Sequence, residues 1–526
     1  MPDSHRTPGI HVEEYRTAAR VITGVPTSAT AFIGRAWRGP VDAPVAIASH
    51  ADYVRVFGGP WHEAPMADAV RQFFDNGGTQ ALVVRVAAGR DPVQPAATPA
   101  TFTLASGHVF LAADPGSWGM NLRIAVENDP DAPGDTNRFA LHVFDDPALR
   151  GNGRDLGGSG ASELHDGLSV DPSDARYAAD VLARESALLR ADDNFPDTAP
   201  TRGIVHADGF SPGDTPSGRD GGAIGYADVA ASDNAEAGTG LYALAHGESF
   251  NLLCIPPFAP GVADNGIATW TAASHLCRER HALLLVDAPA DWDVADARAR
   301  IGDFAALDRA HAALYFPRIV APDPLRPGSD AVYAPCGAVA GVIARIDATR
   351  GVWKTPAGLD AMLRGITGLA IAGQVRALTD FENHELGPLG VNCLREFAGI
   401  GHIVWGARTL DRDSDWKYVP VRRTALYIGE SLRLGLRWAV FEPNGEALWA
   451  ELRLHAGAFL HELFRSGAFA GASPHESYFV KCDRDTVTLA DIDAGIAEIH
   501  VGFAPLRPAE FVVLRIGVRA GRDDDP

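Results

Sequence analysis

Lysine is scarce in this sequence and long apolar runs are absent, and each shortage excludes a class of protein. Three lysines (Lys354, Lys417 and Lys481) and a net charge of −21 provide no basic footprint for phosphates, so we expect no nucleic-acid partner. No apolar run approaches the roughly 18–20 residues that cross a bilayer, so we expect no direct membrane insertion. The opening MPDSHRTPGI lacks a signal-peptide pattern, which predicts assembly in the cytoplasm.

Cysteine is sparse as well, and its spacing is informative. The five cysteines lie far apart, and no two of them form a CxxC pair. A scattered, odd-numbered set in a chain with no visible signal peptide predicts reduced, mostly buried thiols rather than disulfides or a zinc site. The residues concerned are Cys254, Cys277, Cys336, Cys393 and Cys482.

Common catalytic motifs are also missing. The chain has no GxSxG, GxxxxGK[ST] or GxGxxG string, and His461-Glu462 is followed by Arg465 where HExxH needs a second histidine. Asp303, His311 and Cys336 could be imagined as a triad, but 67 acids and 18 histidines offer such trios by chance. We therefore expect no enzyme, no cofactor and no metal. Two alternatives stay open, a monomeric hydrolase-like enzyme and a carbohydrate-binding module.

The chain is rich in aspartate and glutamate, and these acidic residues are unevenly distributed. Residues 91–240 hold 24 acids against 9 lysines or arginines, whereas residues 385–526 hold 20 against 16. A strongly acidic segment would repel itself if it were packed between subunits, so residues 91–240 are expected to face outward. Residues 408–437 reverse the trend, with seven basic residues against four acids.

Hydrophobic periodicity predicts a multidomain α/β protein. Residues 29–90 are typical of a β-α-β unit, in which ATAFIGRA and ALVVRV are strands and MADAVRQFFDNGG is a helix. Such units assemble into a helix-covered, mostly parallel sheet. Short alternating strands then dominate residues 91–240, and the α/β pattern returns near residue 241. Two helices and two strands close the chain, which indicates an α+β unit at the C-terminus. In the second helix Leu448, Leu452, Phe459 and Leu463 are predicted to lie near one face.

Several strings along the chain resemble the sheath proteins of contractile phage tails. The resemblance is greatest to the sheaths of R-type pyocins and of extracellular contractile injection systems, and it runs in family order over nearly the whole length. The strings include PGIHVEE (8–14), TAFIGRAWRGP (30–40), PGSWGMNLRI (115–124), APCGAVAGVIARIDATRGVWKTPAG (334–358), GPLGVNCLR (387–395), SDWKYVPVRRTALYI (414–428) and FEPNGEALWAELR (441–453).

The resemblance implies a domain order. It implies a core of subtilisin-like topology, an inserted outer domain, a C-terminal domain that faces an inner tube, and termini that exchange strands with neighbouring subunits. The expected segments are an N-terminal arm (1–25), the core in two parts (26–90 and 241–384), the inserted β-rich domain (91–240), the tube-facing domain (385–507) and a C-terminal arm (508–526).

The resemblance also implies a function. The chain is expected to be a structural sheath subunit that polymerises with itself around an inner tube protein, with baseplate and cap proteins at the two ends. Energy stored in a metastable extended sheath would drive injection by contraction, so no ATP site is needed. Such a phage-tail-like particle would be assembled in the cytoplasm, and cell lysis could release it.

Two sets of residues are expected to make the contacts between subunits. The arms would donate extended strands to neighbouring subunits. The proposed strand residues are Gly9, Ile10, Val12 and Glu13 at the N-terminus and Val512, Leu514, Ile516 and Val518 at the C-terminus. Candidate tube contacts come from the basic stretch and are Arg422, Arg423, Arg433 and Arg437. For these arginines the alternative is pairing within the subunit with Asp411, Asp413, Asp415 and Glu430.

Overall fold

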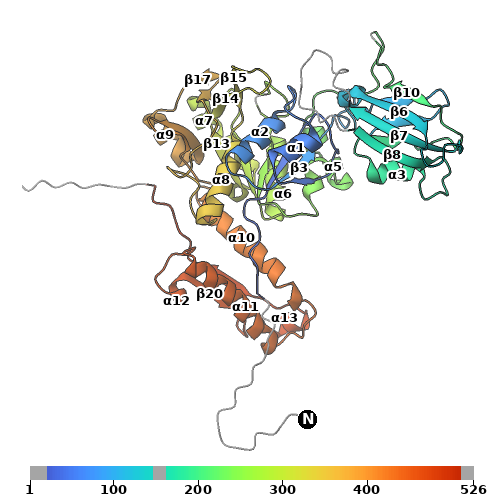
Figure 1. Cartoon of the computed structure of the whole chain (residues 1–526). Helices are drawn as coiled ribbons and strands as arrows, with labels where there is room; N and C mark the ends of the chain where they lie inside the picture. Colours follow the sequence, from blue (N-terminus) through green and yellow to red (C-terminus); the bar gives the residue numbers. More distant parts are fainter. Residues whose placement is uncertain (1–20, 146–161, 212, 263, 511–526) are drawn as a thin grey trace, which may run out of the picture. The chain divides into compact units, whose positions relative to one another are not determined.

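The structure, a computed structural model, describes residues 21–145, 162–211, 213–262 and 264–510. These residues form two compact units (Figure 1). The terminal unit contains residues 21–25 and 427–506, and the core unit contains residues 26–426 and 507–510. Helix α10, Val419–Gly435, begins in the core unit and ends in the terminal unit.

The core unit is built around an eight-stranded sheet. Its six central strands are parallel, and an antiparallel strand is added at each edge. In spatial order the strands are β19 (Gly401–Val404), β18 (Val391–Phe397), β13 (Ala312–Phe316), β12 (Leu283–Asp287), β11 (Leu252–Cys254), β1 (Thr30–Gly34), β3 (Ala81–Arg85) and β2 (Val45–Ile47). The predicted mostly parallel sheet is confirmed.

Helices cover both faces of this sheet, and the alternation of side chains along each strand decides which helix each residue meets. Phe32 of β1 and Leu285 of β12 pack on one face with α2 (Pro65–Asp75) and α8 (Cys336–Arg350). Ile33 and Val286, their sequence neighbours, pack on the other face with α6 (Ile267–Glu279). Because both faces are buried, the central strands are continuous apolar runs rather than alternating ones.

Further elements complete the core unit. A small antiparallel sheet has the strand order β15-β14-β16-β17, and several short helices also belong to this unit. The elements are α1 (His50–Phe57), α4 (Tyr226–Val229), α5 (Ser232–Ala237), α7 (Val294–Arg300), β14 (Arg318–Pro322), β15 (Asp330–Tyr333), β16 (Gly368–Ile371), β17 (Gln374–Val375) and α9 (Asp380–Leu386).

A β-rich segment is inserted in the core unit after β3. A buried cluster that includes Phe102, Phe110 and Phe139 lies mostly in this segment, and Trp37 and Trp61 of the core also belong to it. One sheet is β10 (Gly203–His206), β6 (Leu122–Asn128), β7 (Arg138–Asp145) and β8 (Ser162–Ser169), and the other is β4 (Thr101–Thr103), β5 (Val109–Ala112) and β9 (Leu189–Ala191), with α3 (Ala178–Glu185) beside them.

The insertion is shorter than the expected range of 91–240. Thr98 and Arg219 pair as an isolated antiparallel bridge at its neck. Val229 and Ala230, which the prediction assigned to the insertion, are buried in the cluster on the α6 face of the main sheet. Residues 208–225 are rich in glycine and aspartate, which is typical of a loop. The few apolar residues that follow them pack in the core.

The terminal unit contains the end of α10, helix α11 (Glu446–Arg465) and a two-stranded sheet. Leu448, Leu452, Phe459 and Leu463 of α11 are buried, in line with the predicted apolar face. The remaining elements are α12 (Pro474–Ser477), β20 (Tyr478–Lys481), α13 (Leu489–Asp493) and β21 (His500–Phe503). The expected domain start at residue 385 differs from the structure, because β18 belongs to the main sheet and the terminal unit begins at Tyr427.

Candidate functional site

The strand-donating residues predicted in the two arms lie outside the described residues. These are Gly9, Ile10, Val12 and Glu13 at one end and Val512, Leu514, Ile516 and Val518 at the other. What the structure does describe is the base of each arm and a sheet with the geometry to accept a strand. The candidate site is built from these parts.

The base of the N-terminal arm is held along the second half of α10. Ile22 is buried and contacts Gly435, where any side chain would occupy the space that Ile22 fills. The backbone N–H of Val25 donates a hydrogen bond of 3.1 Å to the Ser431 hydroxyl oxygen. These contacts lie within the terminal unit, so residues 21–25 are attached to this unit.

The terminal unit also contains a sheet of two strands, β20 and β21. They are antiparallel, with Tyr478 opposite Phe503 and Lys481 opposite His500. Among the described residues no third strand joins this sheet, so each outer edge presents backbone N–H and C=O groups without strand partners. A two-stranded sheet is only marginally stable in isolation, and its free edges are templates for a further strand. The arrangement therefore suits the addition of strands from other chains.

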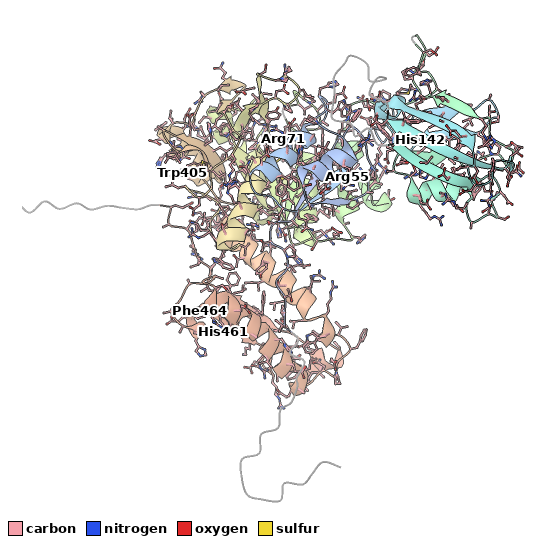
Figure 2. The ribbon with its side chains drawn as sticks, viewed as in Figure 1. Arg55, Arg71, His142, Trp405, His461 and Phe464 are labelled. Carbon is pink, nitrogen blue, oxygen red and sulfur yellow. The ribbon has the colours of Figure 1, made fainter. Side chains whose placement is uncertain are left out.

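One face of β20 packs against α11 through aromatic side chains. His461 and Phe464 of α11 both point toward this strand (Figure 2). The His461 Nδ1 atom lies 3.0 Å from the Tyr478 hydroxyl oxygen, and the Phe469 and Phe503 ring centroids are 5.5 Å apart. By contrast, Phe479 on the opposite face is 58% exposed. The aromatic contacts hold β20 in place, and they leave its edge free.

The four arginines predicted to contact the tube are in very different surroundings. Arg423 is buried and forms a two-point ion pair with Asp347, at 2.9 and 2.5 Å. It also donates to the Thr27 backbone carbonyl. This corrects the prediction for Arg423, because a guanidinium enclosed by the core unit cannot form an exposed pair with another protein.

Arg422 is half-buried and is also engaged within the subunit. Its guanidinium stacks over the Trp416 ring at 4.6 Å and contacts the His311 Nε2 atom. Burial, reinforced by the charge of Arg422, lowers the pKa of His311, so this histidine is neutral at physiological pH. Arg422 thus has a structural role in the core unit.

Arg433 and Arg437 are exposed in the terminal unit. Arg433 forms a two-point pair with Glu430, as the intrasubunit alternative predicted, yet half of its side chain is exposed. Arg433 and Arg437 do not belong to the same helix, because α10 ends at Gly435 and Arg437 begins a 3-10 turn. These two arginines remain the candidates for a contact with the tube.

Asp303, His311 and Cys336, the three residues considered as a catalytic triad, each contact other residues. Asp303 pairs with Arg300, the ring of His311 lies between Ala282 and Arg422, and the Cys336 backbone N–H donates to Asp287. Burial raises the pKa of the Cys336 thiol well above its ordinary value, which opposes formation of a nucleophilic thiolate. All five cysteines are buried and free, as predicted.

Two arginines occupy the carboxyl edge of the main sheet, where open α/β sheets commonly bind ligands. Arg85 is buried and donates to the backbone carbonyls of Ala36, Gly39 and Pro115, the last of which lies in the insertion. Burial lowers the pKa of Arg85 to about 10, so it stays charged at neutral pH. Arg35 donates to Glu63 and to the Asp220 carbonyl. Sequence reasoning missed both residues, whose role here is to join the insertion to the core.

Across residues 21–145, 162–211, 213–262 and 264–510, no group of histidine, cysteine, aspartate and glutamate side chains has the arrangement of a metal site. In the same described part of the chain, no helix is both long and apolar enough to span a membrane.

Comparison with known sequences identifies one family. The family model for the phage tail sheath protein central domain matches residues 230–410, and that for the phage tail sheath C-terminal domain matches residues 411–519. A curated protein of Pseudomonas aeruginosa (strain UCBPP-PA14), described as a prophage major tail sheath protein, is 27% identical over 324 residues. That alignment covers 60% of this chain and 77% of the relative.

Solved structures with a similar fold are also sheath proteins. The helical sheath of the anti-feeding prophage in the contracted state has a TM-score of 0.54 at 21% identity, covering 98% of this chain and 99% of that one. The contracted PVC sheath of an extracellular contractile injection system has a TM-score of 0.55 at 20% identity, with 98% of both chains covered. A sheath tail protein from Listeria innocua has a TM-score of 0.57 at 15% identity, covering 93% and 97%.

Proposed function

Because this chain belongs to the phage tail sheath protein family and is a contractile sheath subunit, we propose that it polymerises through strand exchange into a helical sheath around an inner tube. The observation that supports this most directly is the two-stranded sheet of the terminal unit, whose edges have no strand partner among the described residues. A strand added at such an edge gains a row of backbone hydrogen bonds, which suits a link that must survive large movements.

The arms would supply the added strands. We propose that residues 9–13 and 512–518 pair with the β20–β21 sheets of neighbouring subunits, which makes each contact heterologous. Heterologous contacts that do not close on themselves generate a helix rather than a ring. The core would have a subtilisin-like topology. During contraction the cores of neighbouring subunits would repack against one another while the arms keep the subunits linked. Baseplate and cap proteins would bind the two ends of the sheath, and the acidic insertion would face outward.

Deleting residues 1–16 is expected to abolish sheath polymers and to leave the subunit folded. The deletion spares Ile22 and Val25, which hold the base of the arm against α10. Electron microscopy should show no tubes, and circular dichroism should show an unchanged melting temperature. Tubes of normal length from the truncated chain would contradict the linking role of the arm. Loss of the folded signal would instead show that residues 1–16 belong to their own subunit.

A monomeric hydrolase or carbohydrate-binding module was the alternative considered from the sequence. The two functions predict different particle sizes in solution. A sheath subunit forms large oligomers, whereas such an enzyme or module stays near the 55.7 kDa of one chain. Light scattering of the full-length protein at high concentration therefore separates them.

Reversing Arg433 and Arg437 to glutamate is expected to strip the inner tube from co-purified extended particles while sheath polymers still form. Exposed charge pairs are each worth about 0–1 kcal/mol and are screened by salt, which suits a contact that must release on contraction. The measurement is the ratio of tube to sheath protein after purification at physiological salt. Reversal of Arg465 and Arg484, exposed arginines of the same unit, is the matched control. Unchanged tube content in the Arg433 and Arg437 variant would place the tube contact elsewhere.

A further inference from the structure

The last described residues of the chain are attached to the core unit, although they directly follow β21 of the terminal unit. The terminal unit ends at Leu506, and residues from Arg507 onward belong to the core unit. Glu510 makes the main attachment. Its two carboxylate oxygens accept hydrogen bonds from the Nε and Nη2 atoms of Arg408, at 2.7 and 2.5 Å. The Tyr418 hydroxyl donates a third, at 3.2 Å.

Arg408 is itself fixed to the main sheet. Its backbone N–H donates to the Asn392 Oδ1 atom, and the Asn392 Nδ2 atom donates to its carbonyl, both at 2.7 Å. Asn392 is fully buried in β18. The Arg408 Nη1 atom donates in addition to the Gly387 carbonyl at 2.8 Å. The guanidinium therefore has a set position before Glu510 binds it, so little side-chain entropy is lost in forming the pair.

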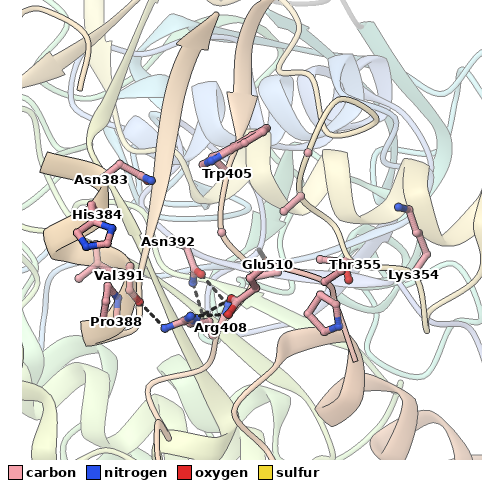
Figure 3. Close-up of a pocket in the computed structure, with 17 residues that line it drawn as sticks. Lys354, Thr355, Asn383, His384, Pro388, Val391, Asn392, Trp405, Arg408 and Glu510 are labelled. Atoms are coloured by element: carbon pink, nitrogen blue, oxygen red, sulfur yellow. Dashed lines mark hydrogen bonds and ion pairs between the residues drawn. The ribbon is translucent and has the colours of Figure 1, made fainter. Parts of the chain in front are cut away.

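The same segment closes one side of a pocket of about 520 Å³. Pro508, Ala509 and Glu510 line it together with Trp405, His384 and Lys354 (Figure 3). The Arg408 and Glu510 side chains are 13% and 26% exposed, so their pair is partly shielded from water. Shielding and two-point geometry both strengthen a charge-assisted hydrogen bond. The neighbouring pair of Arg507 and Asp415, at 61% and 87% exposed, has neither advantage.

We propose that Glu510 and Arg408 anchor the base of the C-terminal arm to the eight-stranded sheet. This rests on the proposed function, in which the residues after Glu510 pair with a neighbouring subunit. Tension on the arm during contraction then passes from Glu510 through Arg408 and Asn392 into the main sheet. The two-stranded sheet of the same chain ends at Phe503, with three residues between it and Arg507, and is spared that tension.

The electrostatics of the pair fit an anchor that holds at neutral pH. Burial alone would raise the pKa of Glu510, but the hydrogen bonds from Arg408 and Tyr418 and the charges of Arg408 and Lys417 hold it below its ordinary value. Burial, aided by the charge of Glu510, raises the pKa of Tyr418, which therefore remains a donor. A lowered carboxyl pKa means that the attachment is complete above the ordinary value of 4.5 and is lost as the pH falls toward the folded value.

The experiment compares the full-length chain with Glu510→Gln and Arg408→Lys, which remove the carboxylate charge or the two-point geometry. Asp415→Asn, which breaks the exposed neighbouring pair, is the matched control. The amides of Thr409 and Val419 are hydrogen-bonded to the carbonyls of Lys417 and Ala407, beside the Arg408–Tyr418 bridge whose side chains Glu510 holds. Hydrogen exchange of these two amides, measured by mass spectrometry, is expected to be at least about tenfold faster in both anchor variants and unchanged in the control. Assembled sheaths of the anchor variants are expected to dissociate at a lower urea concentration than those of the control.

Exchange in Glu510→Gln at the rate of the control would overturn the anchor. So would faster exchange throughout the main sheet, since that would show a general loss of stability rather than release of the arm. Removal of residues 511–526 tests the proposed function separately. If that truncation assembles normally, the arm does not link subunits. If it fails to assemble while Glu510→Gln behaves like the control in exchange and in urea, only the anchor is wrong.

Discussion

Replacing Asp347 by alanine is expected to lower the free energy of unfolding of the core unit by about 3–5 kcal/mol. Asp347 on α8 and Arg423 on α10 face each other with side chains only 1% and 3% exposed. Removing the carboxylate leaves a guanidinium buried without a counter-charge, and the Thr27 carbonyl is its one remaining hydrogen-bond partner among the contacts described above. Urea denaturation followed by circular dichroism measures the change.

Two further variants separate the buried charge from a general effect of substitution. Asp360→Ala removes an exposed partner of Arg350, with side chains 51% and 56% exposed, and is expected to cost less than about 1 kcal/mol. Replacing both Asp347 and Arg423, by leucine and methionine, is expected to recover much of the loss, because no unpaired charge then remains in the core. A cost for Asp347→Ala equal to that of Asp360→Ala would contradict the prediction.

Gly341→Ala is expected to destabilise the core unit by about 1–3 kcal/mol, although alanine favours a helix over glycine by about 1 kcal/mol. Gly341 lies on α8 where this helix meets α2. A Cβ atom there would clash with the Phe73 carbonyl oxygen and would lie 2.6 Å from the Asn76 Cβ atom. The carbonyl belongs to the backbone of α2, so the clash is relieved only by separating the two helices.

The control is a helical glycine in open space. Gly457 on α11 has no atom within 4 Å of the position that a Cβ would take. Gly457→Ala is therefore expected to stabilise the terminal unit by about 0.4–1 kcal/mol, following helix propensity alone. Thermal unfolding of both variants tests whether Gly341→Ala lowers and Gly457→Ala raises the melting temperature. A stabilising Gly341→Ala would show that the two helices do not meet as closely as described.

Part of this protein could be predicted from its sequence because the relevant signal is local. The apolar runs ATAFIGRA and ALVVRV predicted strands of a helix-covered sheet, and the spacing of Leu448, Leu452 and Phe459 predicted the buried face of α11. The family resemblance was local too, since it rested on short strings. Each of these inferences depends on residues a few positions apart, and a periodic pattern reports them directly.

The rest depended on contacts between residues far apart in the chain. Arg423 was taken for an exposed charge, because nothing near it in sequence shows that Asp347, 76 residues earlier, meets it in the core. The anchor was missed for the same reason, since Glu510 and Arg408 are 102 residues apart. The net charge of a segment cannot say which of its side chains are enclosed. Periodicity predicted the mostly parallel α/β core, and the resemblance of short strings to sheath proteins predicted the family. Tertiary structure alone decided which arginines are buried, where the units divide and what holds the base of each arm, because burial and pairing are properties of the folded chain.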